Sequence, residues 1–175
     1  MKFDQQDAKA VVLMGVSGSG KTVVGGLLAE RLGWLFLDAD DYHTAANVAK
    51  MASGKALSDE DRNPWLINLR DLVQQRLVEG QSSVLACSAL KKSYREILIS
   101  NDSRIRLVYL SGSFDLIYSR MRSRQGHYMK EGMLRSQIAT LEPPKEAIEV
   151  SITSAPECIV NTIISALIQH KGHIS

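Results

Sequence analysis

The sequence predicts an α/β fold, in which a parallel β-sheet is covered on both faces by helices. Short runs that are apolar at every position, such as Val11–Met14 and Val84–Cys87, alternate along the chain with segments of helical periodicity. Continuous rather than alternating apolar strands are typical of parallel sheets that are buried on both sides. A chain of 175 residues supplies one substantial core, so we expect a single domain over residues 1–175.

The same pattern places each element along the chain. The expected strands are Val11–Met14, Trp34–Leu37, Val84–Cys87, Ile105–Leu110 and Ile148–Ile152. The expected helices run from Lys21 to Leu32, Ser58 to Gly80, Ser93 to Ser100, Phe114 to Met121 and Pro156 to Leu167. Ser58 with Asp61 resembles a capping box at the start of the second helix. Gly25 and Gly26 inside the first helix would each cost about 1 kcal/mol relative to alanine, and close approach of another element would explain them.

Composition and charge exclude several classes of protein. The 21 lysine and arginine residues nearly balance the 19 acidic residues, so we expect neither a nucleic acid nor a membrane surface as a partner. No apolar run approaches the ~20 residues of a membrane-spanning helix, and residues 1–10 lack the apolar core of a signal peptide. Cys87 and Cys158 lie far apart and predict neither a disulfide framework nor a zinc site. We therefore expect a cytoplasmic protein.

A glycine-rich turn directly after the first strand carries the clearest chemical signal. Its residues, Gly15-Val16-Ser17-Gly18-Ser19-Gly20-Lys21-Thr22, match the pattern G-x-x-x-x-G-K-[ST] in full. The glycines allow a tight turn whose N–H groups point inward at an anion, and the following helix adds its positive N-terminal end. In such a loop the lysine reaches the outer phosphates and the threonine hydroxyl binds Mg²⁺. The sequence therefore predicts a P-loop (residues 15–22) that binds a nucleoside triphosphate.

Two carboxylates, Asp38 and Asp40, follow the second strand. Ligands of parallel sheets lie beyond the carboxyl ends of the strands, so we expect both side chains on the phosphate side. One carboxylate would hold a magnesium-bound water, and the other would accept a proton from an attacking hydroxyl. A helix cap or an exposed loop is the alternative explanation.

Basic residues follow at the next helix start and at the end of the third strand. Arg62 offers a fixed fork of donors that suits a carboxylate, although pairing with Asp59 or Glu60 on a solvated helix would also explain it. Ser88 and Lys91 place a hydroxyl and an amine at the same edge of the sheet. The third strand carries no acidic residue, which counts against a motor ATPase or a conventional GTPase.

The segment after the fourth strand is rich in arginine. Arg120 and Arg124 share one helix face, and two like charges there repel unless an anion lies between them. A lid that brings arginines onto a transferring phosphoryl group would use this arrangement, and a basic solvent face is the alternative. The segment Arg122–Glu146 is polar, contains glycine and proline, and fits a mobile surface segment better than core. His127 has no neighbour at metal-ligand spacing, so we expect no metal site there.

Taken together, these residues resemble the bacterial-type gluconate kinases, a family of shikimate-kinase-like P-loop kinases. The markers are LMGVSGSGKT, FLDADDYH, KMASGKALSDEDRNPWL, CSALKKSYR and RQGHYM, and the resemblance covers nearly the whole chain. It implies a three-layer fold with a parallel five-stranded sheet of order 2-3-1-4-5 and a mobile lid at about residues 120–146. It also implies transfer of the γ-phosphoryl group of ATP to the 6-hydroxyl of D-gluconate, and a homodimer.

Roles follow from the resemblance, position by position. Lys21, Asp40, Arg120 and Arg124 are expected to be catalytic, with Asp40 as the base. ATP is expected to contact Gly15, Ser17, Gly18, Ser19, Gly20, Lys21, Thr22 and Arg120, and Mg²⁺ is expected at Thr22 and Asp38. The sugar acid is expected to contact Asp40, His43, Arg62, Lys91, Arg124 and His127. The chain departs from the family pattern at Ala39, Thr44 and Ile138, and Thr44 is expected to loosen the start of the next helix.

Two alternative functions stay open at this point. One is a kinase of another small hydroxy acid, such as shikimate, or of a nucleoside monophosphate, in the same fold. The other is an ATP-binding regulator without turnover. The segment from Asp38 to Asn63 holds three basic residues against six acidic ones, which suits a sugar acid better than a second phosphate.

Overall fold

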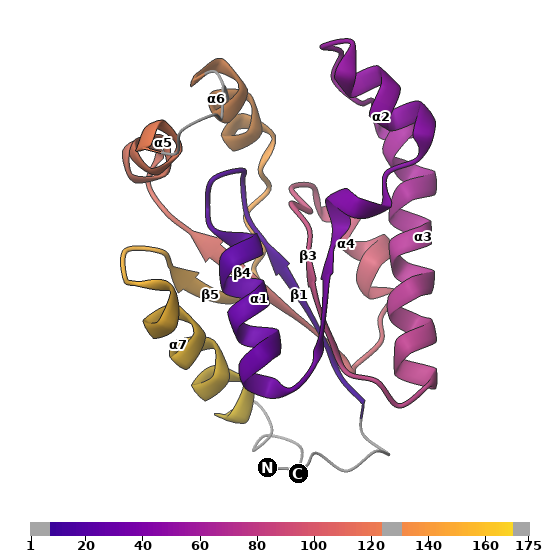
Figure 1. The fold of residues 1–175 in the computed structure, drawn as a ribbon, viewed down its shortest axis with the longest axis vertical. Helices are drawn as coiled ribbons and strands as arrows, with labels where there is room; N and C mark the ends of the chain where they lie inside the picture. The colour runs from indigo at the N-terminus through magenta and orange to yellow at the C-terminus, as the bar shows by residue number, and fades with distance from the viewer. Residues whose placement is uncertain (1–7, 124–130, 170–175) are drawn as a thin grey trace.

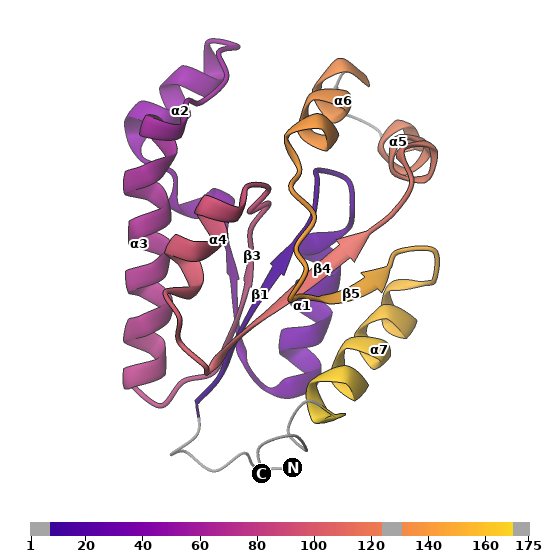
Figure 2. The same ribbon diagram turned by 180° about the vertical axis from the view of Figure 1, so that it is seen from behind.

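A computed structural model describes residues 8–123 and 131–169 of the chain, and these form a parallel five-stranded sheet with helices on both faces (Figures 1 and 2). The strands are β1 (Ala10–Met14), β2 (Leu35–Asp38), β3 (Ser83–Ala86), β4 (Ile105–Ser111) and β5 (Ile148–Ser151). Their order in the sheet is β2-β3-β1-β4-β5, and every neighbouring pair is parallel. The predicted fold class and strand order are therefore confirmed.

Helices fill the connections between the strands. They are α1 (Lys21–Leu32), the 3₁₀ helix η1 (Ala39–Tyr42), α2 (Ala45–Ala52), α3 (Asp59–Val78), α4 (Lys92–Ile99), α5 (Phe114–Ser123), α6 (Glu131–Thr140) and α7 (Pro156–Gln169). None of the helices in these two described stretches is long and apolar enough to cross a membrane.

The central strand β1 divides its side chains between two cores. Val11 and Leu13 point to the face covered by α1 and α7, whereas Val12 and Met14 point to the face covered by α3 and α4. All four side chains are almost fully buried. This double burial is the reason that β1 is apolar at every position.

Glycine inside α1 has a packing reason at one of its two positions. A Cβ atom at Gly25 would lie 2.6 Å from Cε2 of Phe36 on β2, so only glycine lets the helix approach that strand. The expected close approach is thus confirmed for Gly25. It is wrong for Gly26, where a Cβ atom would meet nothing within 4 Å.

The start of α3 follows the sequence signal. Ser58 accepts a hydrogen bond from the backbone N–H of Asp61, and the Asp61 carboxylate accepts one from the backbone N–H of Ser58. The capping box is therefore confirmed, and it fixes the residue at which the helix begins. The first residue of α3, Asp59, takes no part in this cap.

The apolar pattern does not predict α2 or α6. Thr44 caps α2 by accepting a hydrogen bond from the N–H of Asn47, so the expectation that Thr44 loosens this start is wrong. The interpretation of residues 122–146 as a polar surface segment is wrong at α6, because Leu134 on that helix is completely buried in the core. A short helix with a single buried side chain leaves almost no periodic trace in the sequence.

Candidate active site

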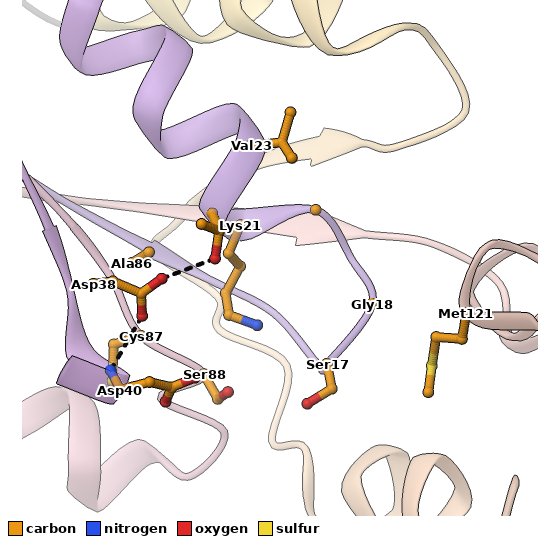
Figure 3. Close-up of a pocket in the computed structure, with 12 residues that line it drawn as sticks. Ser17, Gly18, Lys21, Val23, Asp38, Asp40, Ala86, Cys87, Ser88 and Met121 are labelled. Carbon is orange, nitrogen blue, oxygen red and sulfur yellow. Dashed lines mark hydrogen bonds between the residues drawn. The ribbon is translucent and has the colours of Figure 1, made fainter. Parts of the chain in front are cut away.

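The P-loop connects β1 to α1 and is shaped for an anion (Figure 3). Gly18 and Gly20 both have positive φ, at 81° and 95°, which L side chains rarely adopt. A Cβ atom at Gly18 would also lie 2.5 Å from Cγ of Met121 on α5. Gly20 is the N-cap of α1 and has no side chain, so the first amides of the helix face the loop. This geometry fits the phosphate cradle that the sequence predicts.

Lys21 folds over its own loop. Its Nζ donates hydrogen bonds to the carbonyl oxygens of Gly15 at 2.9 Å and Val16 at 3.1 Å. Burial lowers the pKa of the ammonium group below its usual range, while the carboxylates of Asp40 and Asp38 act in the opposite direction. The amine lines a pocket of about 230 Å³, in which Figure 3 shows Asp38, Asp40 and Ser88 around the same hollow. A phosphate group there would meet an ammonium group that is largely shielded from solvent water.

Asp38 and Thr22 lie together at the edge of this pocket. Thr22 Oγ1 donates a hydrogen bond of 2.9 Å to Asp38 Oδ2, and Asp38 Oδ1 accepts one from the N–H of Asp40. Hydroxyl and carboxylate oxygens are the hard ligands that Mg²⁺ prefers, and it completes its shell with water and phosphate oxygens. Within residues 8–123 and 131–169, no cluster of three or more His, Cys, Asp or Glu side chains provides an alternative metal site. Asp38 is also the cap of η1, so the alternative explanation of this residue holds as well.

Asp40 stands apart from these contacts. Its side chain is 88% exposed and lines the same pocket as Lys21. Among the described residues, the ring of His43 lies beside it, with Nε2 3.8 Å from Asp40 Oδ1. The Asp40 carboxylate therefore lies at the mouth of the phosphate pocket with few partners among the described residues.

His43 is held rigidly beside Asp40. Its ring stacks on Trp65 with a centroid separation of 4.2 Å, and Trp65 Nε1 donates to the carbonyl of Ala39. Burial lowers the pKa of His43, and the positive charge of Arg62 adds to this effect. The imidazole is therefore neutral at pH 7. The sequence signal for Trp65 indicated core packing alone, and its stacking on His43 was not predicted.

A second group of polar side chains lies at the starts of α3 and α4. This acid-side cluster consists of Asp59, Arg62, Lys91 and Tyr94. Lys91 Nζ donates to both carboxylate oxygens of Asp59 at 2.9 and 2.8 Å, and Tyr94 Oη donates to Asp59 Oδ1. Arg62 Nη1 lies 4.0 Å from Asp59 Oδ1 and donates to the carbonyl of Leu57. Arg62 and Lys91 are thus brought together as predicted, and the alternative pairing of Arg62 with Asp59 is also present.

Tyr94 is the member of this cluster that sequence reasoning missed. The Arg62 guanidinium and the Lys91 ammonium lie 5.9 and 5.6 Å from the centroid of its ring. Its neighbour Arg95 is also buried, but it donates to the carbonyls of Ala89 and Leu90. The first turn of α4 therefore directs Tyr94 to the cluster and Arg95 to the loop that follows β3. These two directions cannot be told apart without knowing where the helix lies.

Among the described residues, Arg120 does not line the phosphate pocket. Arg120 Nη2 donates a hydrogen bond of 2.5 Å to the carbonyl of Ile152, which follows β5. Arg124 and His127 lie outside the described residues. From α6, the side chain of Gln137 reaches the P-loop instead, where it accepts from the N–H of Ser17 and donates to the Ser17 hydroxyl.

Comparisons with known proteins agree with this geometry. A family model described as an AAA domain matches residues 11–144. A probable gluconokinase of Mus musculus is 48% identical to this chain, covering 90% of this chain and 96% of that protein. The thermoresistant gluconokinase of Escherichia coli (strain K12) is 39% identical, covering 98% and 100%.

A solved structure shows the same arrangement of elements. The crystal structure of a gluconokinase from Sinorhizobium meliloti 1021 has a TM-score of 0.80 and 34% identity, covering 95% of this chain and 99% of that one. Relatives at these identities span almost the entire chain, and the chain carries a complete P-loop. The chain therefore belongs to the gluconokinase family of P-loop kinases.

Proposed function

We propose that this protein transfers the γ-phosphoryl group of ATP to the 6-hydroxyl of D-gluconate, giving 6-phospho-D-gluconate and ADP. The observation that carries the proposal is the position of Asp40, which lines the P-loop pocket with few partners of its own. The cations of the acid-side cluster supply a site for the acid end of the substrate. The names of the relatives support the same substrate.

The residues divide the reaction between them. The P-loop amides and Lys21 hold the outer phosphates of ATP and offset their charge. The 6-oxygen of gluconate bonds to the γ-phosphorus as the bond to the β,γ-bridging oxygen breaks. Asp40 accepts the hydroxyl proton, and ADP keeps the electron pair of the broken bond. Arg62 and Lys91 hold the carboxylate at the far end of the sugar acid.

Mg²⁺ belongs to this proposal. Thr22 and Asp38 would hold it, and when bound it would neutralise charge on the β- and γ-phosphates. Both oxygens of Asp38 already accept hydrogen bonds, one from the metal ligand Thr22 and one in the η1 cap, so Asp38 is less available than Asp40 to take a proton. We therefore assign the metal side to Asp38 and the hydroxyl to Asp40.

A lid over about residues 120–146 also stays within the proposal. Arg120 would have to leave the carbonyl of Ile152 to reach ATP, and the roles of Arg124 and His127 remain predictions. Gln137 and the buried Leu134 anchor α6 against the P-loop and the core. We therefore expect α6 to stay in place during closure.

The remaining parts of the proposal concern the oligomeric state, the partners and the cellular location. We propose a cytoplasmic homodimer that acts on small molecules, without a nucleic-acid or membrane partner. Sedimentation of the purified protein at micromolar concentration tests the dimer. A single species with the mass of one 19.3 kDa chain would exclude it.

The substrate is tested by a coupled assay of ADP release with gluconate, idonate, shikimate and AMP as acceptors. We expect gluconate to give the highest kcat/KM, with phosphate found on C6 of the product by NMR. The Lys21→Ala variant, prepared in parallel, controls for contaminating kinases. Faster turnover of shikimate or AMP would move the protein to another substrate, and ATP binding without ADP release would indicate a regulator.

A further inference from the structure

The cations proposed to receive the substrate's carboxylate already hold a carboxylate. Asp59 Oδ1 accepts hydrogen bonds from Lys91 and Tyr94, and Asp59 Oδ2 accepts a second bond from Lys91. Arg62 lies 4.0 Å away from the same oxygen that Tyr94 binds. Donors from two helices therefore converge on one planar anion, which is the arrangement that an incoming carboxylate would need.

Asp59 is free to leave this position. Its side chain is 55% exposed, so turning into solvent would carry no cost of burial. It is the first residue of α3, but the cap of that helix is made by Ser58 and Asp61. A change in the Asp59 side-chain rotamer would leave the helix start intact.

The donors that Asp59 occupies are more fixed than Asp59 itself. The side chains of Lys91 and Arg62 are 31% and 33% exposed, and their charged groups lie 5.6 and 5.9 Å from the centroid of the Tyr94 ring. Arg62 is held in addition by the carbonyl of Leu57. The cradle is therefore largely preformed, and its mobile component is the internal anion.

We propose that Asp59 is an internal placeholder, which occupies the carboxylate site of the empty enzyme and is displaced by the carboxylate of the sugar acid. This inference rests on the proposed function for the identity of that acid. The placeholder keeps Lys91 and Arg62 paired while the site is empty and weakens binding of every acid that enters. A neutral polyol has no group that replaces it.

A different role for Asp59 predicts the opposite sign. If Asp59 served only to orient Lys91 and Tyr94 toward substrate, then removing its charge would weaken binding of gluconate. If Asp59 competes with the substrate, removing its charge would strengthen binding of gluconate instead. The direction of one change in affinity therefore separates the two roles.

The test compares Asp59→Asn with Asp71→Asn by calorimetric titration with gluconate in the absence of ATP. Asp71 lies on the same helix, is exposed and pairs with Arg70, so its variant makes the same change in charge away from the cluster. We expect Asp59→Asn to bind gluconate about two- to fivefold more tightly than Asp71→Asn, the range typical of an exposed ion pair. D-glucitol, which carries a hydroxymethyl group in place of the carboxylate, should show no such gain.

The variant Lys91→Gln completes the design, because it should bind gluconate more weakly than the wild type. Weaker binding in both Asp59→Asn and Lys91→Gln would overturn the placeholder and make Asp59 a supporting residue. An equal gain for glucitol would also overturn it. If the wild type binds gluconate but transfers no phosphate to it, the proposed function fails, while the ratio between Asp59→Asn and Asp71→Asn still decides the placeholder. If gluconate bound none of the variants, both the placeholder and the proposed function would be overturned.

Discussion

The two halves of the site are built in different ways. The phosphate half is made of backbone, with glycines at positive φ, the amides at the start of α1 and a lysine bound to loop carbonyls. The acid half is made of side chains at the starts of two helices, and its two cations, Arg62 and Lys91, already face the carboxylate of Asp59. The first half presents a preformed backbone cradle to a ligand, whereas the second must exchange one carboxylate for another. We therefore expect the phosphate half to govern turnover and the acid half to govern affinity.

The largest expected effect falls at the border between the halves. Asp40→Asn keeps the shape of the side chain but cannot take the proton, so kcat should fall by roughly 10²–10⁴, the usual share of general-base catalysis. The binding of ATP should change little. Asp41→Asn, an exposed neighbour on η1, is the matched control, measured by steady-state kinetics with gluconate. Near-normal kcat in Asp40→Asn with severe loss in Asp38→Asn would reverse the roles of the two carboxylates.

The phosphate half is tested by Lys21→Ala. Loss of the ammonium group should lower kcat by about 10²–10³, which is typical when one donor to a developing charge is removed. The melting temperature should not drop, because the lysine is held at a cost of desolvation rather than by packing. Lys92→Ala, at an exposed position on α4, controls for the change in charge. Turnover close to that of the wild type would remove the P-loop from the mechanism.

The acid half is tested by Arg62→Ala. We expect KM for gluconate to rise about tenfold or more, as for other charge-assisted pairs, with little change in KM for ATP. Arg70→Ala, further along α3 and paired with Asp71, is the control for loss of a guanidinium group. A loss of affinity for ATP alone would place Arg62 on the nucleotide side.

The smallest expected effect is a dependence of stability on pH at His43. Burial lowers its pKa in the folded chain below the ordinary value of 6.5, so the unfolded chain takes up the proton at higher pH. Stability should therefore fall as the pH drops below about 6.5 and level off below the lowered pKa. The fall in melting temperature between pH 7 and pH 5 should be smaller in His43→Gln than in the wild type, and equal falls would contradict the shift.

The phosphate half could be predicted from the sequence because its geometry is local. A strand, eight motif residues and a helix follow one another, and the backbone conformation of glycine defines the cradle. The carboxylates Asp38 and Asp40 could be placed beside the phosphate pocket for a related reason, since they directly follow one strand. The strand order was implied by the resemblance to gluconate kinases and not by any local pattern. Local sequence patterns that define backbone shape can be recognised without knowledge of tertiary contacts.

The acid half could be predicted only in part. Arg62 and Lys91 were candidates, but the partner that joins them, Asp59, had been weighed only as a surface neighbour of Arg62. Tyr94 and the contact of Gln137 with Ser17 bring together residues from separate elements, 35 and 120 positions apart from their partners. Periodicity also misses α6, whose single buried residue, Leu134, reaches the core through the packing of the whole segment.

The most direct test of this division is a crystal structure of the protein with a non-hydrolysable ATP analogue, Mg²⁺ and D-gluconate. The account predicts the phosphates on the P-loop, the 6-hydroxyl within hydrogen-bond distance of the Asp40 carboxylate, and the gluconate carboxylate on Arg62 and Lys91. It also predicts that Asp59 has turned away from Lys91. A gluconate carboxylate bound elsewhere, with Asp59 still between Lys91 and Tyr94, would contradict it.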